Sequence, residues 1–355
     1  MATLATTVPT AATATAAPAA LETREAPPTE FRVPPPVQSW YLVGRARDVR
    51  SGAVVSRDVL SAPIVLFRTQ SGALAALSAH CWHMGAHLGN GSVAGERLRC
   101  PLHHWEYDAA GECRRVPGSD EPPAGAHQVA YPVAERFGGV FVFNGPAPLF
   151  PLPSFSAPDD RDLQVSHGRP VYVRCPWYAV AANAFDRQHL QTVHARALRE
   201  PPVVERPDAY RIRLRYVSRV VGHGAADEMM RRLSGDRIRV AVTCWGGNVL
   251  TVESDLGRAR GALLLSLLPV AGGTEITPIF VVHRAGPGAV GAALRAARLA
   301  VSRWLFSRFL ERDVGLLDGM RFRPRLPLPA DEPMASYLAF LQGLPPAQSG
   351  SRSDR

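Results

Sequence analysis

The segment HCWHMGAHLGNGSVAGERLRCPLHHWEYDAAGEC, residues 80–113, carries two cysteine–histidine pairs within one short region. Cys81-x-His83 is followed, after sixteen residues, by Cys100-x-x-His103. Each pair comes at a turn that follows a short run we expect to be a strand. Two loops can therefore each present one thiolate and one imidazole to a shared site.

Three interpretations compete for these pairs. They can be unliganded, but two matching pairs beside glycine and proline turns argue against that. They can form a structural Cys2His2 zinc site, although the first pair then has unusually tight spacing. They can also hold a Rieske [2Fe–2S] cluster, in which two thiolates bind one iron and two imidazoles bind the other. The imidazoles raise the reduction potential, so such a cluster can accept electrons from a plant-type ferredoxin.

The segment closely resembles the Rieske domain of the Rieske non-heme iron oxygenases. In that family C-x-H is followed at a similar distance by C-P-x-H-G-W, with an aromatic residue and an aspartate soon after. The matching positions here are Cys81, His83, Cys100, Pro101, His103, Trp105, Tyr107 and Asp108. The resemblance implies that both cysteines, His83 and His103 bind the cluster. His104 stands where the family usually has glycine, and we interpret it as a local variation; we interpret His80 and His87 as loop residues or as supports for the ligands.

The composition limits the function classes. The chain has 355 residues, 46% of them apolar and 20% charged, which is typical of a soluble globular protein with room for two domains. All 40 basic residues are arginine, and the net charge of +9 favours an acidic partner. The arginines are scattered, with no basic run interleaved with aromatic residues, so we expect no nucleic-acid partner. The longest apolar candidate, residues 261–273, is shorter than the ~18 residues of a membrane helix, so we expect a buried strand there and no membrane span.

The number of cysteines and the composition of the N-terminal residues bear on the cellular compartment of the protein. An odd number of cysteines, five, does not predict a disulfide framework and favours a reducing environment. Residues 1–36 are rich in Ala, Thr and Pro and lack the charged start and apolar core of a signal peptide. We expect a disordered tail there and a cytoplasmic protein. The exclusive use of arginine over lysine is typical of a GC-rich, bacterial genome.

Turn patterns divide the chain into two expected domains. Short apolar runs between Gly, Pro and Asn turns predict a small all-β domain over residues 37–145, followed by a proline-rich linker over 146–160. Residues 161–345 mix period-two strands with helices, which predicts an α+β domain, and 346–355 form a second disordered tail. The expected elements are strands at 63–69, 73–78, 96–101, 138–145, 210–221, 237–245 and 274–284 and helices at 178–198 and 289–320.

A second set of candidate ligands lies in AFDRQHLQTVH, residues 184–194. Asp186 and His189 are three residues apart and share one face of a helix. His189 and His194 are five residues apart, about 140° around an ideal helix, so they do not converge on a regular one. Either the two imidazoles are polar residues on different faces, or an i→i+5 bulge of the kind found at functional sites brings them together.

The surrounding residues favour the second alternative. NAFDRQHLQTVH, residues 183–194, resembles the N-x-x-D-x-x-H-x4-H motif of the catalytic domain in the same oxygenase family. The resemblance implies that His189 and His194 bind a mononuclear Fe(II) and that Asn183 lies near the iron. It also implies that Asp186 is not a ligand but bridges, by hydrogen bonds, from an iron-binding histidine to a Rieske histidine of the neighbouring subunit, here His103.

A facial triad of two histidines and one carboxylate needs a third ligand and leaves positions open for O2 and substrate. In the family this carboxylate lies far downstream, on a long C-terminal helix. FLERDVGLLDGM, residues 309–320, fits that position. Asp313 is our first choice, with Asp318 and Glu311 as alternatives, and a solvated helix charge is the competing interpretation of Asp313.

The resemblance implies a β-rich Rieske domain followed by a helix-grip-like (START-like) α+β catalytic domain. It also implies an oxygenase that uses O2 and electrons passed from the cluster to the Fe(II). The electrons would originate from NAD(P)H and arrive through a separate ferredoxin or flavin reductase, since the chain has no nucleotide-binding G-x-G-x-x-G after a strand. The family's oxygenases are commonly homotrimers. The single-chain organisation favours a monooxygenase, demethylase or oxidative cyclase over a two-subunit ring dioxygenase.

The sequence leaves alternatives open for the substrate and for the class of function. We expect a hydrophobic aromatic, polycyclic or sterol-like substrate, but Leu264, Ile276, Ile279 and Phe280 suit a pocket wall and a packed core equally well. The alternatives to an oxygenase are a Rieske electron-transfer protein with a degenerate second domain and a zinc-stabilised lipid-binding module. The survival of both histidines, Asn183 and Asp186 in the second motif argues against the electron-transfer protein.

Overall fold

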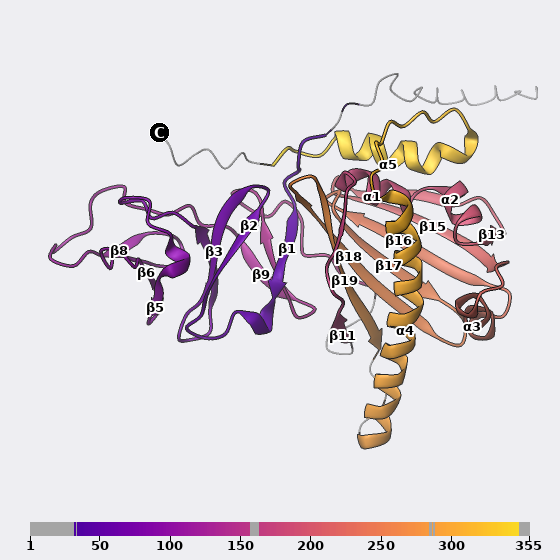
Figure 1. The fold of residues 1–355 in the computed structure, drawn as a ribbon, viewed down its shortest axis with the longest axis horizontal. Coiled ribbons are helices and arrows are strands. Elements are labelled where there is room, and N and C mark those ends of the chain that lie inside the picture. The colour runs from indigo at the N-terminus through magenta and orange to yellow at the C-terminus, as the bar shows by residue number, and fades with distance from the viewer. Residues whose placement is uncertain (1–31, 33, 157–162, 284–285, 287, 348–355) are drawn as a thin grey trace, which may run out of the picture. The chain divides into compact units, whose positions relative to one another are not determined.

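The computed structural model in Figure 1 shows several small β-sheets in the first part of the chain, followed by one large β-sheet with helices. The structure describes residues 32, 34–156, 163–283, 286 and 288–347. The tails expected over 1–36 and 346–355 lie outside these residues except at their inner ends. There, Val37 forms a β-bridge with Pro346, and the Ala347 amide donates to the Pro36 carbonyl at 2.7 Å. The first and last described segments therefore lie side by side.

Within residues 34–156 the strands form antiparallel sheets with the orders β1-β10-β9, β2-β3-β4 and β5-β6-β7-β8. The strands are short because turns with glycine at positive φ interrupt them, as at Gly72 and Gly95. Their bounds are β1 Trp40–Arg45, β2 Val54–Val59, β3 Ala62–Arg68, β4 Leu74–Ser78, β5 Ser92–Ala94, β6 Arg97–Arg99, β7 Glu106–Tyr107, β8 Cys113–Arg115, β9 Val133–Arg136 and β10 Gly139–Phe143, with 3-10 turns at Ala46–Asp48 and Leu88–Asn90.

The second region is built on one long antiparallel sheet of order β11-β19-β18-β17-β16-β15-β13, with β12 paired to β19 and β14 to β15. Its strands alternate in side-chain type, as in β15, where Ile212 and Leu214 are buried and Arg215 is exposed. The strands are β11 Leu163–His167, β12 Val171–Val173, β13 Arg196–Leu198, β14 Val203–Asp208, β15 Arg211–Val220, β16 Ile238–Trp245, β17 Val249–Asp255, β18 Arg260–Val270 and β19 Gly273–His283. The helices are α1 Trp177–Asn183, α2 Arg187–Thr192, α3 Ala225–Ser234, α4 Gly288–Leu317 and α5 Glu332–Gln342, with a 3-10 turn at Pro329–Asp331.

The longest helix, α4, lies across one face of this sheet (Figure 1) and contacts β19 and β11. Its 30 residues extend over roughly 45 Å, since a helix rises about 1.5 Å per residue. A long helix packed against an antiparallel sheet confirms the α+β prediction. The helix begins and ends within a few residues of the expected 289–320.

The helix predicted over 178–198 was wrong in its extent. The chain forms two short helices, α1 and α2, and residues 196–198 belong to strand β13 instead. The break falls at Asp186, whose side chain caps α2 by accepting a hydrogen bond from the His189 amide. Aspartate favours such a capping position over a helix interior, and this preference starts a separate helix, α2, within the motif.

The proline-rich segment expected as a linker packs against the sheets as far as it is described. Phe150 and Phe155 are buried in one core cluster with Trp40 and Val249. The Trp40 indole N–H donates to the Phe150 carbonyl at 3.0 Å. Aromatic residues between the prolines therefore fix this segment, because each buries a large apolar area.

Candidate metal centres

The two loops of the first cluster bring their cysteines into the core. β4 ends shortly before Cys81 and β6 directly before Cys100, and the two thiols are 4% and 1% exposed. Backbone turns close each loop, with Cys81 N bonded to the Ala86 carbonyl at 2.9 Å and Cys100 N to the Trp105 carbonyl at 2.8 Å. The Cys81 thiol also lies 3.1 Å from the Tyr107 hydroxyl. Burial raises the pKa of the Cys81 thiol, so a thiolate here needs a bound cation to stabilise it.

The two imidazoles lie on the exposed side of the same loops. The rings of His83 and His103 are 4.9 Å apart between centroids. The His83 ring stacks on the buried Trp105 ring at 4.4 Å, nearly parallel at 7°. The loops therefore present a buried pair of thiols and an exposed pair of imidazoles.

This separation favours a two-iron cluster over a single zinc ion. Around one tetrahedral zinc, ligand atoms lie about 3–4 Å from one another. Within the described residues, the group of three or more ligand atoms that all lie within 4.8 Å of each other is elsewhere, at His189, His194 and Asp313. The Cys81, His83, Cys100 and His103 set does not converge on one point, which suits two irons with a thiolate pair and an imidazole pair.

The other histidines of these loops have local roles. His104 takes a left-handed backbone conformation, with φ of 60°, where the family's glycine would be unstrained. His87 accepts the Gly89 amide at 3.1 Å through Nδ1, and His80 forms a β-bridge with His87. These contacts fit the interpretation of His80 and His87 as loop residues.

The second motif contains an irregular turn, which was one of the two possibilities that the spacing of its histidines allowed. The His194 amide points to the carbonyl of His189 at 3.4 Å, an i→i+5 contact, and Ala195 follows with a φ of 50°. The turn is wider than an α-turn, so the two imidazoles reach the same side. Asp186 Oδ1 holds the start of α2 by accepting the His189 amide at 2.9 Å.

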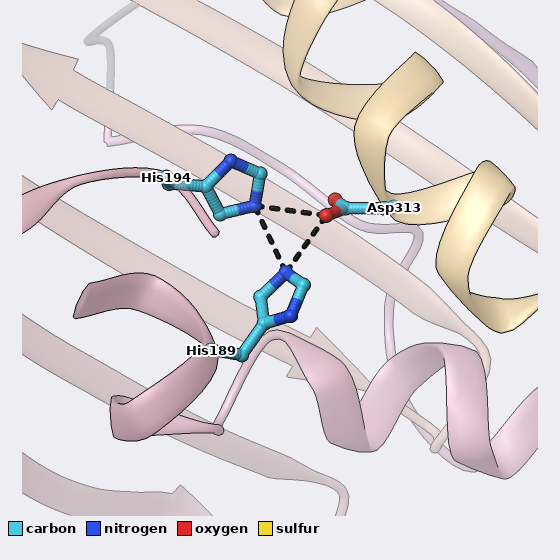
Figure 2. A group of neighbouring side chains, drawn as sticks. All are labelled: His189, His194 and Asp313. Carbon is cyan, nitrogen blue, oxygen red and sulfur yellow. Dashed lines mark hydrogen bonds and ion pairs between the residues drawn. The ribbon is translucent and has the colours of Figure 1, made fainter. Parts of the chain in front are cut away.

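Two histidines and one aspartate converge at this turn (Figure 2). His189 Nε2 lies 3.0 Å from His194 Nε2. Asp313, which reaches in from α4, places Oδ1 2.8 Å from each of these nitrogens. Asn183 Nδ2 lies 3.2 Å from His189 Nε2.

The donor set fits a divalent metal with an open face. Ligand atoms about 2.1 Å from one ion lie about 3.0 Å apart at right angles and about 3.4 Å apart in a tetrahedron. The observed distances of 2.8–3.0 Å match the right-angled, facial arrangement. In their neutral form the two imidazoles offer Nε2 lone pairs beside the carboxylate oxygen, so a cation is the group that can satisfy all three atoms together.

The electrostatics of the triad agree with that chemistry. Burial acts to raise the pKa of Asp313, but hydrogen bonds and charge from His189 and His194 outweigh it, and the pKa is lowered. Nδ1 of His194 is buried and has no hydrogen-bond partner within the part of the chain that the structure describes. Its ring is instead held by stacking on Phe309, 4.1 Å between centroids.

The alternative carboxylates lie away from the triad. Asp318 pairs with Arg174 at 2.6 Å, and this guanidinium lowers the pKa of Asp318 to about 2. Glu311 pairs with Arg308 at 3.0 Å. Asp313 is therefore the acidic residue of this helix that the fold brings to the two histidines.

An apolar cavity of about 800 Å³ extends from the triad between α4 and the sheet. One face of α4 lines it, at positions four residues apart: Val301, Leu305, Phe309, Asp313 and Leu317. The sheet contributes further apolar residues, among them Leu214, Val240, Val242, Leu250, Val252 and Leu263. The cavity is within the size range of small-molecule sites, about 300–1,000 Å³.

Of the four residues that suited both a pocket and a core, Ile276 lines the cavity. Leu264 and Ile279 lie in the packed core on the other side of the sheet. The two neighbours of Leu264 line the cavity, because successive side chains of a strand point to opposite faces. Phe280 packs under the guanidinium of Arg303 on α4, 5.8 Å from the ring centroid.

Comparisons with known proteins agree with the first centre. Residues 39–135 match the family described as Rieske [2Fe-2S] domain. The chain is 34% identical over 166 residues to aminopyrrolnitrin oxygenase PrnD of Pseudomonas fluorescens, which covers 44% of this chain and 46% of that protein. It is 26% identical over 309 residues to cholesterol 7-desaturase nvd of Bombyx mori, which covers 82% of this chain and 65% of that protein.

Solved structures share the fold over most of the chain. Dicamba monooxygenase bound to dicamba superposes with a TM-score of 0.67 at 18% identity, covering 86% of this chain and 96% of that one. NdmA of Pseudomonas putida CBB5 with caffeine gives a TM-score of 0.63 at 20% identity, covering 89% and 96%.

The chain therefore contains a Rieske [2Fe–2S] domain, as the first motif predicted, and it is similar to proteins named as oxygenases and oxygenase components. The matched regions span less than two thirds of the length of the two curated relatives described above. No helix within the described residues is long and apolar enough to cross a membrane.

Proposed function

We propose that this chain is the oxygenase component of a Rieske system that oxidises a hydrophobic substrate with O2. The observation that carries the proposal is the right-angled His189, His194 and Asp313 triad on the wall of an apolar cavity of about 800 Å³. A metal site that faces an apolar cavity suits oxidation of an apolar molecule more than a purely structural role.

The residues divide between two centres. Cys81, His83, Cys100 and His103 would hold the [2Fe–2S] cluster in a domain spanning residues 37–145. His189, His194 and Asp313 would hold Fe(II) in a domain spanning 161–345, and this iron supplies O2 activation when bound. Asn183 Nδ2 lies 3.2 Å from His189 Nε2, so its side chain would stand beside the iron, while the apolar walls exclude water from the reacting carbon.

The substrate class follows the cavity walls. We infer an aromatic, polycyclic or sterol-like substrate that is hydroxylated, demethylated or oxidatively cyclised, with monooxygenation as the reaction class. Relatives named as an aminopyrrolnitrin oxygenase and a cholesterol 7-desaturase support a hydrophobic substrate.

Partners follow from the electron requirement. We infer that a separate ferredoxin or flavin reductase delivers electrons from NAD(P)H, and the net charge of +9 favours an acidic donor. We also infer a cytoplasmic homotrimer in which Asp186 of one subunit bridges to His103 of the partner subunit. Relatives named as oxygenase components support a system with separate proteins.

The experiment is a single-turnover assay on anaerobically purified protein. The protein should be red-brown, with two iron and two sulfide in the cluster plus one mononuclear iron. Dithionite-reduced cluster should be reoxidised by O2 rapidly when a hydrophobic substrate is present, with formation of an oxidised product. His189→Ala should keep the cluster spectrum and lose product, whereas a colourless, zinc-only protein would contradict the proposal.

The electron-transfer protein is the competing function. It predicts a cluster that cycles normally while the second domain binds no iron. Wild-type iron content at the triad and its loss in His189→Ala therefore distinguish the two functions.

A further inference from the structure

A buried ion pair supports the irregular turn that carries His194. Arg196 is 3% exposed and Asp227 is also 3% exposed. Nη1 of Arg196 donates to Asp227 Oδ1 at 2.9 Å and to the carbonyl of His194 at 2.8 Å. The same nitrogen lies 3.4 Å from the carbonyl of Ala195. One guanidinium thus holds the backbone directly after a residue of the triad.

The same side chain also supports the imidazole. The guanidinium carbon of Arg196 lies 5.1 Å from the centroid of the Phe309 ring, within the range of a cation–π contact. Phe309 in turn stacks on His194 at 4.1 Å and 13°. Arg196 therefore acts on His194 from two directions, through its carbonyl and through the ring that packs on its imidazole.

Asp227 is built into this position from α3. Its Oδ2 accepts the Gly224 amide at 3.2 Å, which fixes the carboxylate at the start of the helix. The chain passes so close at Gly222 that a Cβ there would lie 2.3 Å from Asp227 Oδ2. Glycine at 222 is therefore required for the carboxylate to reach Arg196.

The turn needs such support because its own geometry is weak. The His194 amide makes only a long i→i+5 contact, and Ala195 has a positive φ that costs about 1 kcal/mol or more for a residue other than glycine. Besides Arg196, the Val221 amide holds this turn by donating to the Ala195 carbonyl at 2.9 Å.

We propose that Arg196 and Asp227 are positioning residues that fix His194 for binding of the mononuclear iron. The inference rests on the proposed function, since it assumes that the triad binds Fe(II). Neither side chain belongs to the triad, and both act through His194. Hydrogen-bonded residues behind metal ligands typically change metal affinity by about 10–100-fold when they are removed.

The test compares Fe(II) affinity and folding in matched variants of the full chain. Arg196→Met alone leaves Asp227 buried and unpaired, which can unfold the protein. The double variant Arg196→Met/Asp227→Leu removes both charges together, and such apolar replacements of buried pairs are often neutral for stability. We expect it to fold with an intact cluster spectrum but to bind Fe(II) at least about tenfold more weakly in a chelator competition.

Two further variants make the readout specific. Arg196→Lys keeps the charge opposite Asp227 and should restore part of the Fe(II) affinity. Arg174→Gln/Asp318→Asn removes an ion pair near the end of α4 that does not contact His194, and it should leave Fe(II) affinity unchanged. The electron paramagnetic resonance spectrum of the nitric oxide adduct of Fe(II) should shift in the Arg196 double variant and not in this control.

The outcomes separate the two proposals. If His194→Ala does not reduce the Fe(II) that the wild-type chain binds, the triad is not an iron site. The proposed function then fails, and this inference fails with it. If wild type binds Fe(II) and the Arg196 double variant binds it equally well with the same spectrum, only the positioning role is overturned. If the double variant does not fold, Arg196→Gln/Asp227→Asn, which removes both charges but keeps polar side chains of similar size, gives the same comparison.

Discussion

Asp186 lies where a helix cap and an electron-transfer contact can be separated by two substitutions. Its Oδ1 accepts the amide of His189 at 2.9 Å and so starts α2. The resemblance to the oxygenases implies a second role, a hydrogen bond to His103 of the partner subunit. Asp186→Asn and Asp186→Ala affect these two roles differently.

The structure sets the size of each effect. Asparagine caps a helix about as well as aspartate, so Asp186→Asn should change stability by only a few tenths of a kcal/mol. Alanine removes the cap, which costs about 1 kcal/mol and corresponds to a fall in melting temperature of about 2–4 °C. The loss matters locally because α2 has only six residues and is too short to be stable alone. In the asparagine variant the amide oxygen keeps the cap, and an N–H group replaces the oxygen that would accept an imidazole N–H.

The assay follows reoxidation of the reduced cluster by stopped-flow absorbance with substrate and O2 present. For Asp186→Asn we expect full iron content, unchanged assembly and normal reduction by ferredoxin, but reoxidation slowed by about 10–100-fold. Asp186→Ala should show the same slow reoxidation together with the lower melting temperature. Normal reoxidation in the asparagine variant would show that Asp186 acts only as a helix cap. Loss of the mononuclear iron from this variant would show that Asp186 is a ligand.

Three further predictions concern single side chains. Asp313→Ala should lose the mononuclear iron and turnover but keep the cluster spectrum, while Asp318→Ala should keep the iron and turnover. Metal analysis of the two variants checks this, and the opposite result would refute the choice of Asp313. His104→Gly should raise stability by up to about 1 kcal/mol in denaturant unfolding, because glycine relieves the positive φ of 60° at some cost in unfolded-state entropy; a destabilised variant would show that the His104 side chain makes a needed contact. Burial acts to raise the pKa of Glu106, but hydrogen bonds and charge from Arg99 and Arg115, two of its three arginine partners, outweigh this and lower it. Its stabilising effect is therefore present above the ordinary value of about 4.3 and is lost as the pH falls below it, so Glu106→Gln should flatten the acid limb of a stability profile, and an unchanged limb would contradict this.

The first centre could be predicted from sequence because its information is local. Each cysteine–histidine pair spans only a few residues, and the strand before each pair is a short apolar run between turns. The structure adds what spacing cannot give, namely that the thiols are buried and the imidazoles exposed. It also explains His104, since the family's glycine matches a left-handed backbone position that no sequence pattern reveals when a histidine occupies it.

The helix over 178–198 shows where periodicity misleads. Apolar residues recur at helical spacing through the motif, yet the capping preference of Asp186 and the strand pairing of residues 196–198 with β15 override it. Spacing of five residues between two histidines left both a regular helix and a bulge possible. The i→i+5 contact, followed by a positive φ, depends on tertiary structure because the amide of Val221, directly after β15, holds the turn.

Long-range contacts complete the second centre, and these are what one sequence cannot supply. Glu311 and Asp313 of α4 and Asp318 directly after it lie within eight positions of one another, and a helical repeat alone does not choose among them. In the folded chain Glu311 pairs with Arg308 of the same helix and Asp318 pairs with Arg174, while Asp313 faces the histidines. Arg196 and Asp227 lie 31 residues apart and belong to no motif. A charged pair that is almost fully buried is costly unless each charge is satisfied, so its place directly behind His194 is the physical reason to test it as part of the proposed iron site.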